Sequence, residues 1–192
     1  MSAIRLDQFA AYEDSLDPIG DEFREHTAYL DRARRVRVGP SVVVVFENAR
    51  TLRLRLRDLA WFARKTTPDR VDPAVRWYQS LLPQPTRVVA SVTVAAADHA
   101  LARTVGAATV ELRVGEYIVP GVLLANAAGD RVIGQVRWAR FEFAAADRAA
   151  LADEARPLFL RVEAPGYCHE SLPLGPAVRA GLLADLGVGP AN

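Results

Sequence analysis

Hydrophobic residues follow two different periods along this chain, and the change comes near Pro85. Up to that point most apolar residues recur at helical spacing, and a β-branched run, Val42–Phe46, interrupts them. Beyond it, short stretches alternate apolar and polar residues, which is typical of half-buried strands. The pattern predicts helices over 4–12, 21–35, 52–63, 72–82, 98–104, 147–155 and 175–187, and strands over 42–46, 87–95, 109–114, 117–124, 135–143, 158–163 and part of 164–174.

The segment that follows the β-branched run fits both periods. Leu52, Leu54 and Leu56 alternate with arginines, as in a strand, while Leu52, Leu56, Leu59 and Ala63 recur at helical spacing. The length of the pattern favours a helix of about three turns, with Asn48 or Thr51 as its N-cap. A strand remains the alternative.

The order of these elements predicts the fold class. Helices come first and short strands with few crossovers follow, which indicates an α+β fold. We expect N-terminal helices packed on a mainly antiparallel, mixed-order sheet, with a C-terminal helix. The length of 192 residues suits one domain over 1–192. Its expected parts are a helical lead-in (1–38), a strand–helix core (41–83), a sheet-rich part (86–173) and the C-terminal helix (175–187).

Composition narrows the class of protein. Hydrophobic residues make up 51% and the net charge is +1, so the chain is not typical of a disordered protein and has no overall field to attract nucleic acid. The single cysteine excludes an internal disulfide and a CxxC metal pair. No apolar run approaches the roughly 20 residues needed to span a bilayer. We therefore expect a cytoplasmic protein without a membrane partner.

Charge is unevenly distributed along the first third of the chain. Acidic residues dominate 1–31 and arginines dominate 32–64. The simplest expectation is that the two segments neutralise each other in the fold. On a helix the arginines around Arg53 and Arg57 fan around the axis, so ion-paired or solvated arginines are favoured over an anion site.

Candidate chemistry concentrates where the β-branched run turns into the next helix. Glu47 and Asn48 stand at that corner, which is either a helix cap or the edge of a ligand pocket. The side chains that could line such a pocket are Glu47, Asn48, Thr51, Arg55, Asp58, Arg137 and Arg140.

Other motifs point away from catalysis. Cys168 and His169 are adjacent, so on a strand their side chains lie on opposite faces and cannot form a catalytic pair. The sequence lacks HxxxH or CxxC spacing and a glycine-rich phosphate loop. We expect no metal and no cofactor, and the balance favours a protein that is not an enzyme.

The stretch RRVRVGPSVVVVFENARTLRLRLRDL resembles the signature of the DUF3501 family, bacterial proteins of unknown function. The elements RWYQSLLP, GQVRWARFEF and APGYCHESLPLGPAVRAGLLADL resemble other parts of its pattern, in the same order. Where the family pattern has Q-x-Q-E-M, this chain has Arg55-Leu56-Arg57-Asp58-Leu59. The resemblance implies an iron–sulfur or rubrerythrin-like protein as partner.

The sequence leaves three candidate functions to be tested. The first is an accessory protein that binds a redox or metabolic enzyme without catalysing a reaction. The second is a small-molecule enzyme or binder with a pocket near Glu47, Asn48 and Asp58. The third, and the weakest, is nucleic-acid binding through the Arg32–Arg64 region.

Overall fold

The computed structural model describes residues 21–66, 71–124 and 136–188, and the side chains of 58–66 and 71–74 lie outside that description. The α-helices are α1 (Asp21–Ala33), α2 (Ala49–Thr66), α3 (Val71–Ser80), α4 (His99–Thr104), α5 (Ala145–Ala152) and α6 (Pro176–Asp185). The strands are β1 (Arg35–Val38), β2 (Val42–Glu47), β3 (Arg87–Val94), β4 (Thr109–Val114), β5 (Tyr117–Leu124), β6 (Val136–Glu142), β7 (Leu158–Ala164) and β8 (Tyr167–Glu170). The predicted helix over 4–12 lies outside the described residues.

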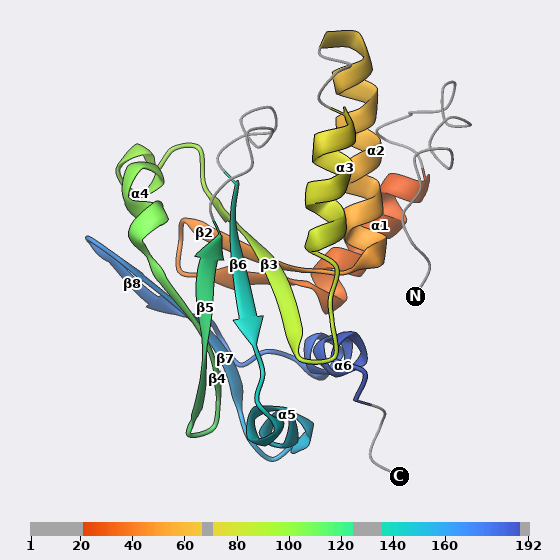
Figure 1. Cartoon of the computed structure of the whole chain (residues 1–192). Helices are drawn as coiled ribbons and strands as arrows, with labels where there is room; N and C mark the ends of the chain where they lie inside the picture. The colour runs from red at the N-terminus through yellow and green to blue at the C-terminus, as the bar shows by residue number, and fades with distance from the viewer. Residues whose placement is uncertain (1–20, 67–70, 125–135, 189–192) are drawn as a thin grey trace.

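The strands form one strongly curved sheet in the order β1-β2-β3-β6-β5-β4-β7-β8 (Figure 1). All of its described pairings are antiparallel, which confirms an α+β fold with an antiparallel sheet. The expected mixed order is not confirmed, because most neighbours in the sheet are also consecutive in the chain. The sheet bends until its two edge strands approach each other, so its shape is close to a barrel.

The two faces of the sheet carry separate hydrophobic clusters. The inner face holds the larger cluster, to which β2 contributes Val42, Val44 and Phe46. On the outer face, Leu52 and Leu56 of α2 pack with residues of α3 and with Trp138 of β6. Burial of apolar area on both faces, at about 25 cal/mol per Å², is the main favourable contribution to folding.

The expected packing of N-terminal helices on the sheet is not confirmed. The helices that cover the outer face are α2 and α3, whereas α1 lies beside β1 and α6 (Figure 1). The physical reason is that α1 buries little apolar surface, since His26 is its one buried residue and Phe23 is 49% exposed. Its C-terminal end is held instead by Arg34, which donates to the Asp185 carboxylate of α6 and, at 2.8 Å, to the Tyr29 hydroxyl.

One strand was missed in the sequence. The predicted helix ran to Arg35 and the helical lead-in to residue 38, but α1 ends at Ala33 and Arg35–Val38 forms β1. Val36 and Val38 are buried and alternate with arginines, and the strand pairs with β2 from Arg35–Val45 to Val38–Val42. Gly39 makes the tight turn between them with a φ of 66°.

The ambiguous segment after β2 is helical, which confirms the favoured interpretation. It forms α2, and the fully buried Leu52 and Leu56 lie one turn apart on the face that meets the sheet. The other predicted helices and strands within the described residues match those observed, with ends displaced by a few residues. No helix in the described ranges has the length and hydropathy to cross a bilayer.

The ion pair between Arg34 and Asp185 generates the first prediction. The two side chains are only 5% and 10% exposed, so removing one charge leaves the other buried without compensation. We expect Asp185→Asn to lower the free energy of unfolding by about 3–5 kcal/mol. The double variant Arg34→Met/Asp185→Leu removes both charges and should recover most of that loss, as measured by urea denaturation. A double variant as unstable as the single one would contradict this account.

Candidate functional site

The corner at the end of β2 is a helix cap. The Asn48 side-chain oxygen accepts hydrogen bonds from the backbone N–H groups of Arg50 and Thr51, at 3.0 and 3.1 Å. In return the Thr51 hydroxyl accepts from the Asn48 N–H at 2.8 Å. This reciprocal arrangement satisfies backbone donors that the first turn of α2 would otherwise leave unpaired. The capping interpretation of Asn48 is therefore confirmed.

Glu47 is fully buried and linked to α2 and β3. Its Oε1 accepts hydrogen bonds from Arg55 Nε at 2.9 Å and from the Ser91 hydroxyl at 2.7 Å. Arg55 also donates to Ser91 at 2.8 Å and lies over the ring of Trp138, with Cζ 5.5 Å from the ring centroid. One side of the carboxylate is thus neutralised by a guanidinium that is itself partly exposed.

The other side of this cluster holds polar atoms without partners. Glu47 Oε2 and Trp138 Nε1 are buried and accept or donate no hydrogen bond within the described part of the chain. A buried polar atom in this state costs free energy, so each is a place where a water molecule or ligand atom would be stabilised. The two residues lie on the same face of the sheet. Glu47 pairs with Val89 of β3 and Trp138 pairs with Ser91, and Val89 and Ser91 are two residues apart on that strand.

His26 of α1 adds a titratable group to the cluster around Glu47, and the sequence analysis did not include it among the site residues. It is buried, and burial together with the positive charges of Arg50, Arg55 and Arg57 lowers its pKa, while Glu47 acts in the opposite direction. The imidazole is therefore neutral near pH 7. A signal in the sequence was available, since His26, Tyr29 and Leu30 share one helical face.

The structure brings only some of the predicted pocket residues together. Glu47, Asn48, Thr51 and Arg55 form one hydrogen-bonded group. On β6, Arg140 pairs with Val89 and lies on the Glu47 face, whereas Arg137 pairs with Val92 and lies on the opposite face. The Asp58 side chain is outside the described residues. A pocket shared by all of these residues remains a prediction, and Arg137 points away from the others.

Many of the arginines in the Arg32–Arg64 region are ion-paired, as the sequence favoured. Arg55 pairs with Glu47, Arg57 with Glu22 at 2.7 Å, and Arg35 with Asp31. Cys168 is exposed on β8, with its sulfur 3.5 Å from Arg161, and the His169 ring packs at a tilt against the Tyr167 ring. Across the described ranges no three His, Cys, Asp or Glu residues are placed to hold a metal ion.

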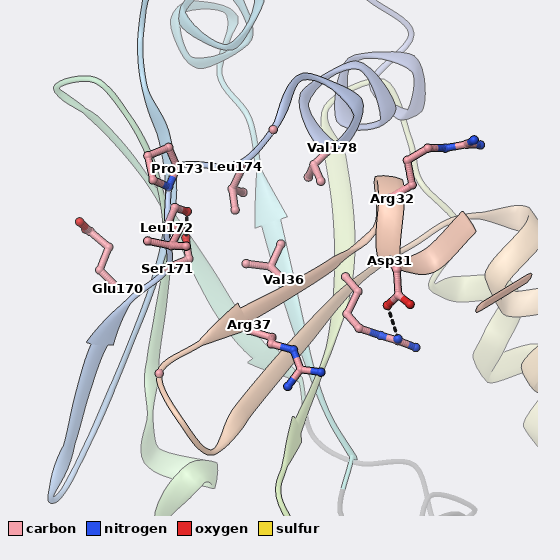
Figure 2. A pocket seen from close by; sticks show the side chains of 13 residues that line it. Asp31, Arg32, Val36, Arg37, Glu170, Ser171, Leu172, Pro173, Leu174 and Val178 are labelled. Carbon is pink, nitrogen blue, oxygen red and sulfur yellow. Dashed lines mark hydrogen bonds and ion pairs between the residues drawn. The ribbon is translucent and has the colours of Figure 1, made fainter. Parts of the chain in front are cut away.

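A second site, which sequence reasoning missed, is a groove of about 450 Å³ between β1 and the segment 170–175 that leads into α6. Figure 2 shows Val36, Leu174 and Val178 pointing toward one another in its floor. Arg32, Arg35 and Arg37 also line it, and Leu172 at its side is 85% exposed. We call this the β1 groove.

The charges in the β1 groove are not balanced. Its two acidic residues are engaged, since Asp31 pairs with Arg35 and Glu170 pairs with Arg113 of β4 at 2.8 Å. Within the described part of the chain, Arg32 and Arg37 are exposed and form no ion pair or hydrogen bond. The groove therefore combines an apolar floor with two available cations.

Comparison with known proteins gives a family and a fold. The family model described as "Protein of unknown function (DUF3501)" matches residues 9–186. A crystal structure of a novel protein of unknown function from Burkholderia pseudomallei is similar, with a TM-score of 0.74 and 22% identity. The match covers 96% of this chain and 99% of that one, and it establishes the fold alone. Among curated proteins nothing matches.

The link between Glu47 and Arg55 generates the second prediction. Arg55→Met leaves the buried Glu47 carboxylate without its cation, and we expect the free energy of unfolding to fall by about 1–3 kcal/mol. The matched control is Arg53→Met, an exposed position on the same helix, which should change stability by less than about 0.5 kcal/mol. Equal effects of the two variants in urea denaturation would rule out the linking role of Arg55.

The lowered pKa of His26 predicts a dependence of stability on pH. In the unfolded chain this imidazole titrates near its usual pKa of about 6.5, and in the folded protein at a lower pH. The unfolded state therefore binds more protons as the pH falls below about 6.5, and the free energy of unfolding decreases there. His26→Gln should reduce this slope, measured by denaturation between about pH 7.5 and 5.5. His99→Gln, at an exposed position on α4, is the matched substitution with which the effect of His26→Gln is compared.

Proposed function

Because the chain belongs to the DUF3501 family of proteins of unknown function, we propose from its own geometry that it is a non-catalytic accessory protein. In this proposal the β1 groove binds an acidic segment of another protein. The observation that carries it is the pair of exposed arginines, Arg32 and Arg37, beside an apolar floor and an exposed Leu172. A redox or metabolic enzyme as the partner rests on the family resemblance alone.

The contents of the groove favour a protein segment over a small anion. Leu172, which is 85% exposed, and the half-buried Leu174 supply apolar surface that an inorganic anion would leave uncovered, above the buried Val36 and Val178. The cations lie at exposed positions, where they accelerate association and add selectivity rather than large affinity. Binding of an acidic segment with apolar side chains between its acids would use both features.

The other two candidate functions have weaker support. At the corner, the Glu47 carboxylate is already neutralised by Arg55, and Arg137 lies on the other face of the sheet. A small-molecule site there would have to be built from fewer residues than predicted. For nucleic acid, several arginines of the Arg32–Arg64 region already pair with acids, which leaves fewer to contact phosphates.

Charge reversal in the groove tests the proposal. The probe is a fluorescent synthetic peptide of about six residues that alternates glutamate and valine, measured by anisotropy at low salt. We expect Arg32→Glu/Arg37→Glu to weaken binding by at least about tenfold, since two attractive contacts become repulsive. The matched control is Arg53→Glu/Arg103→Glu, which reverses two exposed arginines of α2 and α4 and changes net charge equally.

The control variant should bind the peptide as the unchanged protein does. A peptide that alternates glutamine and valine should bind weakly to all three proteins. Equal losses in the two double variants would mean that net charge, not the groove, attracts the peptide. Absence of binding to the unchanged protein would also contradict the proposed function.

A further inference from the structure

One edge of the sheet presents unpaired backbone groups to the β1 groove. The Phe46 N–H donates to the Arg34 carbonyl at 3.0 Å, which makes Arg34 and Phe46 a hydrogen-bonded pair. Such pairs alternate along an antiparallel ladder, so the backbone groups of Val36 and Val38 face β2. The N–H and C=O groups of Arg35 and Arg37 therefore point away from β2. Among the described strands none pairs with this side of β1.

The space beside this edge is the groove itself. The whole of β1 apart from Val38 lines it, and its opposite wall is the segment 170–175. At one end the Tyr167 hydroxyl donates to the Val38 carbonyl and lies 3.3 Å from the Ser41 nitrogen, which fastens the turn of the hairpin to β8. The unpaired groups of Arg35 and Arg37 lie beyond this fastening, where the groove is open.

We infer that the acidic segment of the partner binds by adding a short β-strand to the free edge of β1. The inference rests on the proposed function and specifies how its site recognises the partner. An added strand would form up to four backbone hydrogen bonds with Arg35 and Arg37, two accepted from their N–H groups and two donated to their carbonyl oxygens. This mode of binding gives affinity through the main chain and selectivity through alternate side chains.

The pleat of β1 specifies the chemistry of the bound segment. Val36 points to the inner face and forms part of the apolar floor, whereas Arg35 and Arg37 point to the outer face. Cross-strand neighbours lie on the same face, so the added strand places every second side chain over Val36, Leu174 and Val178 and the others beside the arginines. The segment that fits is extended and alternates apolar with acidic residues.

Backbone methylation of the peptide tests the strand. N-methylation removes a donor and blocks pairing, and only alternate residues of an added strand face β1. Two versions of the glutamate–valine peptide are compared, one methylated at alternate amides and the other at the intervening amides. We expect one version to bind at least about tenfold more weakly than the unmodified peptide and the other to bind about as well.

Each result separates the two proposals. Equal affinity of the two methylated peptides, whether retained or lost, overturns the added strand while leaving an acidic site in the groove. If the unmodified peptide does not bind, the proposed function fails first. Both proposals are supported if the unmodified peptide binds and only one of the two methylated peptides binds more weakly.

Two further measurements exclude other occupants. If the full chain sediments as a dimer that Arg37→Glu dissociates, the groove belongs to a second copy of the chain and the inference is overturned. It is also overturned if the peptide binds only after the chain's own acids are neutralised by substitution; these are Asp7, Glu13, Asp14 and Asp17. If the chain is a monomer and binds the peptide without any of these substitutions, neither a second copy nor the chain's own acidic residues occupy the groove.

Discussion

The arrangement of this protein depends on a sheet that curves until its edges meet without pairing along their length. Tyr167 fastens the hairpin end of β1 to β8, and a side chain at Gly39 would collide with Tyr167 and His169. The opposite end of β1 is held through Arg34, which reaches Asp185 on α6. Between the two fastenings β1 keeps a free edge, and the groove is the space that remains. Free edges invite pairing with other chains, so a short, arginine-flanked edge suits a selective docking site.

A second polar connection holds the outer layer. Arg55 reaches from α2 to Glu47 at the end of β2, and Ser91 of β3 closes the group. Buried charges of this kind add little net stability, but they tolerate few alternative arrangements of the helix on the sheet. Because Arg55 forms an ion pair with Glu47, fewer polar groups remain for a ligand at this corner.

The sequence was most informative where one local pattern decided the structure. The β-branched run of β2, the leucines at Leu52 and Leu56, and the cap at Asn48 all act within a few residues of each other. β1 was missed because its four residues follow a helix and carry two arginines, and only pairing with β2 makes them a strand. Ser91 donates a hydrogen bond to Glu47, and the charge of Glu47 acts on His26, although the three residues come from elements distant in sequence. No spacing in the sequence predicts this grouping. The β1 groove needs residues near 35 and near 172 at once, so it could not be read from periodicity.

The most direct test of the central claim is amide hydrogen exchange at single-residue resolution by NMR, with and without the glutamate–valine peptide. The account predicts that the amides of Arg35 and Arg37 exchange rapidly in the free protein and become protected when the peptide binds. The amides of Val36 and Val38, already paired with β2, should change little. Peptide binding that leaves Arg35 and Arg37 unprotected would contradict an added strand on β1.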